Sequence, residues 1–147
     1  MFDAKTLLTV GQNSIMRKVV QRSDTAASYS KDLNRFLSTT AVIDMAIRAS
    51  METIDKYLPD NFISIGFDIK FTHTAATSLG MTVTVKASIV AIEGHEIDFH
   101  IDVWDEQGEI GYGTHKRSIV SKQHLYDHAD RRTRFLANQR IEESKQG

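Results

Sequence analysis

The segments 39-TTAVIDMAIRASMETIDKYL-58 and 62-FISIGFDIKF-71, which follow one another across the only proline, decide the fold. The first has apolar residues at the i, i+4 and i+8 spacing of one helical face, at Ile43, Ile47, Met51, Ile54 and Leu58. Apolar residues on its other sides indicate a helix that is buried on most faces. A hydroxyl at Ser38 or Thr39 can cap the first turn, and Pro59 ends the helix because proline cannot continue the hydrogen-bond ladder.

From residue 62 the apolar period changes to two, which is typical of β-strands with one face toward a core. Three such runs follow one another, over residues 63–71, 81–91 and 97–103. The inward face of the first is expected to hold Ile63, Ile65, Phe67, Ile69 and Phe71. Gly94 and Gly108 lie between runs where tight turns need glycine, so the last strands should form an antiparallel meander. A fourth run, 109–121, is weaker because Gly111 and Gly113 interrupt it.

The two ends of the chain add less. Residues 13–22 can supply a further strand, and residues 122–147 have the composition of a charged C-terminal helix or tail. We therefore predict an α+β fold over residues 1–121, in which a curved antiparallel sheet of five or six strands wraps round one long central helix.

The composition excludes several classes of function. With 18 Lys and Arg, 19 Asp and Glu and a net charge of -1, the chain has no field that would hold a nucleic acid or an anionic membrane. There is no cysteine, which excludes disulfides, thiolate metal ligands and a cysteine nucleophile. No apolar run approaches the ~20 residues that span a bilayer, and the N-terminus does not have the pattern of a signal peptide. The expected location is the cytoplasm.

Three strings within residues 37–120 are distinctive. They are LSTTAVIDMAIRASMETIDKYLP at 37–59, SIGFDIKFTHTAATSLGMTVTV at 64–85 and EIGYGTHKRSIV at 109–120. HTAAT, followed by a glycine and an alternating TVTV strand, and GTHKR are their most specific parts. These strings resemble the fluoroacetyl-CoA thioesterase family, whose members have the hotdog fold and cleave acyl-CoA thioesters. The resemblance implies a single hotdog domain over residues 1–121, a homodimer or a tetramer of paired dimers, and no cofactor beyond the CoA of the substrate.

The resemblance also implies a reaction centre at a subunit interface. Its threonine at the helix start corresponds to Thr39, its histidine to His73, and its glycine close to the acyl group to Gly66. The family has a glutamate eight residues after the threonine, and this chain has Ile47 there. We expect Gly66, Ile47 and Thr74 to contact the substrate.

Thioester hydrolysis needs a nucleophile, or a base that activates water, and donors for the oxyanion that forms on the carbonyl. The imidazole of His73 can exchange protons near neutral pH, and Thr39 lies beside helix amides that suit an oxyanion. Ile47 cannot act as a base, and Asp44 is the nearest carboxylate along the helix. Asp44 is either a substitute base or the partner of Arg48, four residues on, in an ion pair.

Each of these residues also has a structural interpretation. The histidine can close a strand and bond to Thr72 or Thr74, the threonine can be only a helix cap, and Gly66 can allow a bulge. Two functions follow. The first is hydrolysis of a small or medium acyl-CoA by His73 and Thr39, with Asp44 as a substitute base. The alternative is a protein that binds acyl-CoA or a small acid without turnover. No metal site is expected, since the only histidine-rich string lies in the charged terminal segment.

Overall fold

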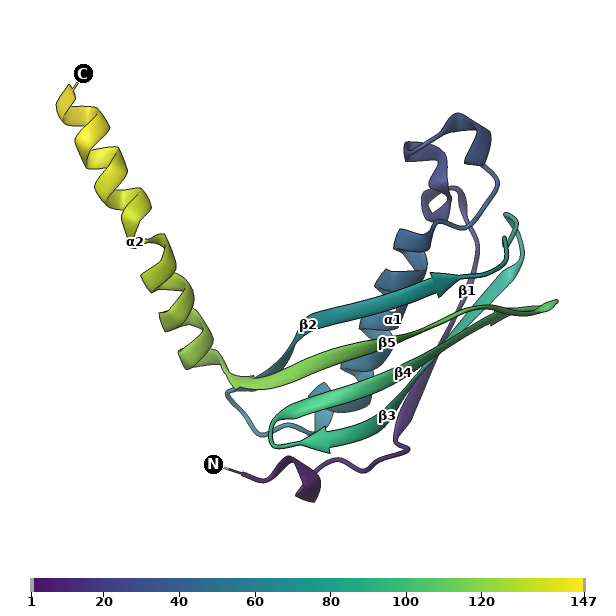
Figure 1. The fold of residues 1–147 in the computed structure, drawn as a ribbon, viewed down its shortest axis with the longest axis horizontal. Helices are drawn as coiled ribbons and strands as arrows, with labels where there is room; N and C mark the ends of the chain where they lie inside the picture. Colours follow the sequence, from purple (N-terminus) through teal and green to yellow (C-terminus); the bar gives the residue numbers. More distant parts are fainter. Residues whose placement is uncertain (1, 147) are drawn as a thin grey trace.

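Within residues 2–146, which the computed structural model describes, the chain has two α-helices and one sheet of five strands (Figure 1). In chain order these elements are β1 (Asn13–Val19), α1 (Thr39–Ile54), β2 (Phe62–His73), β3 (Thr82–Glu93), β4 (Glu96–Asp105), β5 (Gly108–Ser121) and α2 (Lys122–Gln146). Short 3-10 helices occupy Ala4–Thr6, Arg22–Asp24, Ala26–Ser28, Lys31–Leu33 and Asp55–Tyr57.

The sheet is antiparallel throughout, with the strand order β1-β3-β4-β5-β2. Strands β3, β4 and β5 form the predicted meander, and Gly94 and Gly108 adopt positive φ values of 60° and 124° in its two turns. The sheet curves round α1, which lies across one of its faces (Figure 1). The predicted α+β arrangement of a curved sheet round one central helix is confirmed, with five strands.

Helix α1 packs against the sheet with a different face from the one that its i, i+4 spacing predicted. The buried side consists of Val42, Met45, Ala46, Ala49, Ser50, Thr53 and Ile54. Of the predicted stripe, Ile43 and Ile47 are only half-buried and Met51 is 38% exposed. Small residues on the buried side let α1 approach the sheet closely. The larger apolar residues of the neighbouring face therefore remain partly in solvent in a single chain.

Strand β2 contains a β-bulge that changes its inward face part-way along. Its register with β5 shifts between Gly66 and Asp68, so Phe67 is the extra residue, and its side chain is 52% exposed. Before the bulge the inward residues are therefore even-numbered, and Ser64 is buried. The predicted inward alternation is right for Ile69 and Phe71 and wrong for Ile63, Ile65 and Phe67.

Strand β5 has 14 residues, although the sequence predicted a weak strand there. A side chain at Gly113 would clash with the backbone of Lys70, and one at Gly111 would meet the ring of Phe71. The two glycines therefore make room for β2 and its side chains and do not interrupt the strand. Between the sheet and α1 lies a core of Val42, Ala46, Ile54, Val83, Val85, Ala87, Ile89, Ile97, Phe99, Ile101 and Val103.

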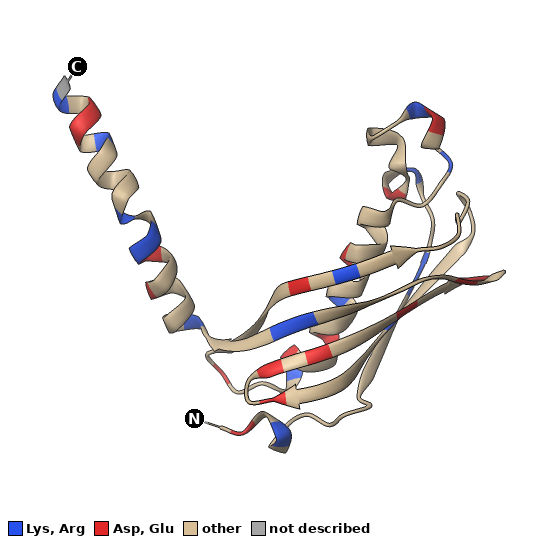
Figure 2. Cartoon of the chain, viewed as in Figure 1, with Lys and Arg blue, Asp and Glu red and all other residues tan. Residues whose placement is uncertain are grey.

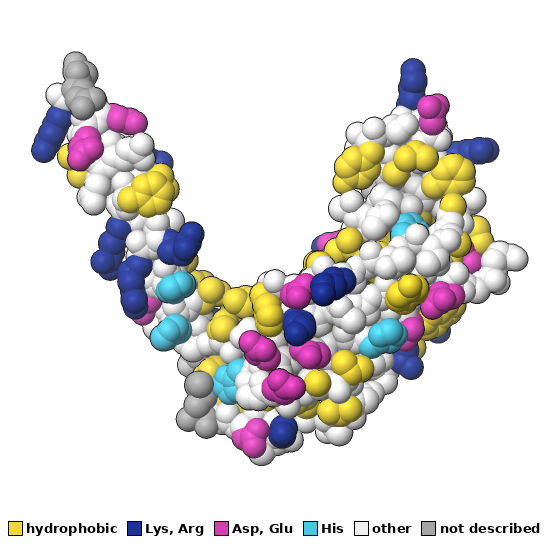
Figure 3. All heavy atoms as spheres, in the orientation of Figure 1, with side chains coloured by type: hydrophobic (Ala, Val, Ile, Leu, Met, Phe, Trp, Pro, Cys, Tyr) yellow, Lys and Arg dark blue, Asp and Glu magenta, His cyan; other side chains and the backbone are white. Residues whose placement is uncertain are grey.

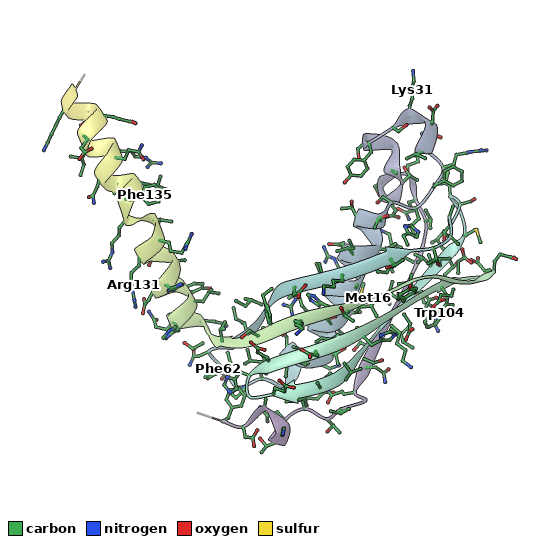
Figure 4. The ribbon with its side chains drawn as sticks, in the orientation of Figure 1. Met16, Lys31, Phe62, Trp104, Arg131 and Phe135 are labelled. Carbon is green, nitrogen blue, oxygen red and sulfur yellow. The ribbon has the colours of Figure 1, made fainter. Side chains whose placement is uncertain are left out.

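Helix α2 leaves the sheet at the end of β5 and projects away from the body of the molecule (Figure 1). Arg131 and Phe135 lie on it, far from the sheet (Figure 4), and apolar side chains are visible along its surface (Figure 3). Charges of both signs are spread over the helices and strands, in keeping with the net charge of -1 (Figure 2). Neither helix of the described chain combines the length and the hydropathy needed to cross a bilayer.

Candidate active site

The first residue of α1 and the last residue of β2 meet at one end of the sheet. Thr39 Oγ1 lies 2.9 Å from His73 Nδ1, which is hydrogen-bond distance. Ser38 is the helix cap, and its Oγ accepts a hydrogen bond of 3.0 Å from the amide of Ala41. The hydroxyl of Thr39 is thus free to bond to the imidazole. The structure brings together the threonine and the histidine that the resemblance singled out, and the partner of His73 is not the Thr72 or Thr74 of the alternative, structural interpretation.

The environment of His73 favours the neutral imidazole. Burial lowers its pKa below the ordinary value, and the nearby backbone of Ala75 opposes that shift. Its Nε2 atom is buried and has no hydrogen-bond partner among residues 2–146. A buried polar atom without a partner costs free energy, so Nε2 marks a place where the site needs a further group.

An open hollow of about 360 Å³ surrounds this pair and is lined by Leu37, Thr39, His73, Thr74, Ala75 and Ala76. Thr74 lines it from the loop after β2, where its amide donates a hydrogen bond of 2.7 Å to the carbonyl of Ile110. The first amides of a helix have no acceptor within the helix, and Ser38 takes only that of Ala41. The amides of Thr39 and Thr40, at the same helix start as the Thr39 hydroxyl, therefore remain available to an acceptor.

A second cavity, of about 490 Å³, lies further along the same helix and strand. Ile47 lines it from α1 and Gly66 from β2, together with His115 and Arg117 of β5. A Cβ atom at Gly66 would lie 2.9 Å from His115 Cε1 and 3.0 Å from Arg117 Nη1. The glycine thus gives these two side chains the room that they occupy. Asp68 is the one carboxylate among the described residues of the lining, and it is exposed.

His115 and Arg117 were not predicted as site residues from the sequence, and both are 3% exposed. Arg117 Nε donates a hydrogen bond of 2.9 Å to Ser64 Oγ, and Nη2 donates one of 2.8 Å to the carbonyl of Ser64. The Ser64 hydroxyl donates in turn to the carboxylate of Asp55. Alternate positions in the string GTHKR were the signal for this pair, because they place both side chains on one face of a strand.

The hydrogen bonds of His115 fix its protonation state. Its Nδ1 is 2.9 Å from the carbonyl oxygen of Asp68, and its Nε2 is 3.2 Å from Arg117 Nη1. A carbonyl only accepts and a guanidinium only donates, so Nδ1 carries the proton and the imidazole is neutral. Burial lowers the pKa of His115, and the nearby charge of Arg117 lowers it further, against the effects of the Asp68 carbonyl and carboxylate. Burial also lowers the pKa of Arg117, although the charge of Asp55 opposes this.

The two cavities are well separated within one chain. Gly66 and His73 are seven positions apart on β2, which at ~3.3 Å per residue is about 20 Å. Thr39 and Ile47 are eight positions apart on α1, or about 12 Å at ~1.5 Å per residue. A short acyl group bound at Thr39 therefore does not extend to Gly66 or Ile47 of the same chain.

A family model described as fluoroacetyl-CoA-specific thioesterase matches residues 20–123, which is more than half of the chain. The chain belongs to the fluoroacetyl-CoA-specific thioesterase family. A fluoroacetyl-CoA thioesterase of Streptantibioticus cattleyicolor is 39% identical over 72 residues, which are 49% of this chain and 52% of that protein. The chain thus spans about half the length of this curated relative.

Solved structures with the hotdog fold are similar over most of the chain. A hot-dog-like protein from Thermanaerovibrio acidaminovorans is 30% identical with a TM-score of 0.85, over 89% of this chain and 97% of that one. A mutant of the fluoroacetyl-CoA thioesterase in complex with acetyl-CoA is 26% identical with a TM-score of 0.77, over 86% and 99%. A thioesterase superfamily member of Thermus thermophilus has a TM-score of 0.80 over 88% and 97%, and its identity of 22% shows the fold alone. The expected hotdog fold is confirmed.

The position of Asp44 does not support the expectation that it replaces the glutamate of the fluoroacetyl-CoA-specific thioesterase family. Its carboxylate accepts a hydrogen bond of 2.7 Å from Arg48 Nε, and both side chains are exposed. It lines a different hollow, beside Tyr29 and Thr40. The alternative of an ion pair with Arg48 is the one that the structure contains. Within residues 2–146, no group of three or more His, Cys, Asp or Glu side chains is arranged to hold a metal ion.

Proposed function

We propose that the protein hydrolyses a small or medium acyl-CoA thioester with Thr39 and His73, in a cleft between two copies of the chain. The observation that carries the proposal is the distance of 2.9 Å between Thr39 Oγ1 and His73 Nδ1. Membership of the fluoroacetyl-CoA-specific thioesterase family supports a thioester as the substrate. The acetyl-CoA complex of a related structure supports an acyl group carried by CoA.

The pair can perform a two-step hydrolysis. Thr39 Oγ1 attacks the thioester carbonyl, and its proton passes to His73 Nδ1. The amides of Thr39 and Thr40 stabilise the oxyanion, the carbon–sulfur bond breaks, and the imidazolium returns its proton to the leaving CoA sulfur. Water, activated by the same imidazole, then releases the acid from the threonine ester. This sequence needs a neutral imidazole at the start, and the lowered pKa of His73 supplies it at neutral pH.

The separation of the two cavities supports a site that two copies complete. Strand β2 is an edge of the sheet, so its backbone groups have no neighbouring strand on one side within residues 2–146. Antiparallel pairing of two β2 strands about a two-fold axis near Ile69 would bring His73 of one copy close to Gly66 of the other. The unpartnered Nε2 atom of His73 also favours a site completed by a further group.

One observation favours the alternative, a protein that binds the thioester or a small acid without turnover. Ile47 projects an apolar side chain into the second cavity, at the position where the resemblance implies a catalytic glutamate. A cleft with no carboxylate at that position has lost one of the groups that can activate water. On this alternative Thr39 and His73 only orient the ligand.

Steady-state hydrolysis of a panel of short and medium acyl-CoAs distinguishes the two functions. We expect turnover by the wild type and a decrease of roughly 10²–10⁴-fold in kcat/KM for His73→Ala and Thr39→Val. Thr40→Val is the matched control, because it removes the neighbouring hydroxyl, which bonds to Tyr29 and not to the histidine. Equal, background-level rates in the wild type and all variants contradict the hydrolase. Tight binding of an acyl-CoA by a wild type that hydrolyses it only at the background rate supports the alternative.

A further inference from the structure

A buried arginine with no carboxylate of the described residues in direct contact lines the second cavity. Arg117 is 3% exposed, and within residues 2–146 no carboxylate oxygen lies within 4.0 Å of its guanidinium. The nearest acidic group in its network, Asp55, is reached only through the hydroxyl of Ser64. Removing a charge from water is costly unless an opposite charge or several hydrogen bonds compensate for it. Arg117 has three hydrogen bonds but no carboxylate of the described chain in contact, so the cavity beside it is electrostatically suited to an anion.

Two N–H groups of the Arg117 guanidinium also have no acceptor among residues 2–146. Three of its five N–H groups are used by Ser64 and His115, and one N–H on each terminal nitrogen remains. Gly66 lets Nη1 lie close to the β2 backbone at the wall of the cavity, since a Cβ atom there would crowd it at 3.0 Å. Ile47 also lines the cavity, and its apolar side chain cannot compete for these donors. Two N–H groups on one guanidinium match the two oxygens of a carboxylate.

The other titratable groups around the cavity, His115 and Asp68, do not prevent an anion from binding to Arg117. His115 is held neutral by its two hydrogen bonds, so it neither repels nor replaces the guanidinium. Asp68 is the one carboxylate among the described lining residues, and it is exposed to solvent, where its repulsion of an anion is screened.

We propose that Arg117 binds a carboxylate carried by the acyl group, so that the preferred substrates are CoA thioesters of dicarboxylic acids. This inference deepens the proposed function and rests on it. Because Arg117 lies far from His73 in its own chain, it contacts the far end of an acyl group that reacts at Thr39 of the other copy. An arginine in this place selects the substrate through its charge and takes no part in bond breaking.

The matched ligands for a test are succinyl-CoA and succinamyl-CoA, which differ only in a terminal carboxylate or the neutral amide of the same shape. We expect kcat/KM to be at least about tenfold higher for succinyl-CoA, since a charge-assisted hydrogen bond is worth ~1.5–3 kcal/mol. The same preference is expected in the Kd values of the two non-hydrolysable thioether analogues, measured by calorimetry. The second measurement needs no turnover.

Arg117→Gln removes the charge and keeps a side chain that can bond to Ser64, and it should reduce the preference to about one. Lys116→Gln is the control, because it removes the charge of the adjacent residue, which points to the opposite face of β5. Ile47→Glu is a second variant that leaves Arg117 in place. Its new carboxylate pairs with the guanidinium, so it should lower the preference of the analogues for the carboxylate form, with folding checked by thermal melting.

The outcomes separate this inference from the proposed function. Hydrolysis of both thioesters without a preference overturns the inference and leaves the hydrolase standing. A preference in analogue binding without turnover supports the inference and contradicts the hydrolase. A preference that survives both Arg117→Gln and Ile47→Glu in folded protein shows that the selectivity comes from elsewhere and overturns the role of Arg117.

Discussion

His115 is confined to its neutral form by a donor on one side and an acceptor on the other. If Nε2 were protonated, its N–H would point at an N–H of Arg117, and the positive charges of the imidazolium and the guanidinium would repel each other. The same imidazole fills the space over Gly66, so it also shapes the second cavity. One buried residue therefore both contacts Arg117 and shapes the wall of this cavity.

This confinement predicts a loss of stability in mild acid. The folded-state pKa of His115 is below the unfolded value of about 6.5, so between the two values the unfolded chain binds more protons. The free energy of unfolding therefore falls as the pH is lowered below about 6.5, and the fall stops below the folded pKa. His73 contributes in the same direction.

The measurement is the melting temperature between pH 7 and pH 5. In His115→Gln the amide can still donate to Asp68 and accept from Arg117 but does not titrate, so its melting temperature should fall less steeply. His124→Gln, on the exposed surface of α2, should follow the wild-type slope. Parallel slopes for the wild type and His115→Gln would refute the argument.

At the scale of elements, the start of α1 positions the Thr39 hydroxyl against His73. Ser38 is buried, and its Oγ closes the first turn at Ala41, which leaves Thr39 to face His73. Ser38→Ala should lower the free energy of unfolding by about 0.5–2 kcal/mol, a decrease of a few degrees in the melting temperature. A less ordered first turn should also lower kcat, because Thr39 would be held less firmly against His73.

Ser30→Ala is the matched control for this prediction. Its hydroxyl caps the three-residue helix Lys31–Leu33 through an exposed hydrogen bond of 3.3 Å to the amide of Asp32. The same chemical change should therefore alter the free energy of unfolding by less than about 0.5 kcal/mol, as is usual on the surface. Equal effects of the two substitutions would show that the cap does not organise α1.

The sequence predicts the elements well and their inward faces less well, for identifiable reasons. Periodicity identifies helices and strands. A single extra residue, however, exchanges the inward and outward faces of the rest of a strand, as Phe67 does in β2 and Val90 does in β3. The Thr39–His73 pair could be predicted because the threonine and the histidine each lie in a specific string. The place of Arg117 in the second cavity could not be predicted, because it depends on the pairing of β2 with β5, which puts Gly66 directly opposite Arg117.

For the whole molecule, the surfaces left open by the fold indicate a second copy. Strand β2, an edge of the sheet, and Ile47 line the second cavity, and Ile43 and Met51 continue the partly exposed apolar stripe along α1. Pairing of two chains through these surfaces would bury apolar area and satisfy the edge of the strand. We therefore expect light scattering at micromolar concentration to give at least twice the chain mass of 16.6 kDa.

A charge on each edge of the sheet tests which edge is used. Phe67→Lys places a cation on β2, where it would be buried on pairing, so this variant should have the mass of one chain. It should also lose hydrolysis although Thr39 and His73 are untouched, because each site then lacks the Gly66 side contributed by the other copy. Val19→Lys is the control, since Val19 is similarly exposed, at 51%, on the opposite edge strand β1. A dimeric, fully active Phe67→Lys variant would rule out β2 as the interface and with it the composite cleft.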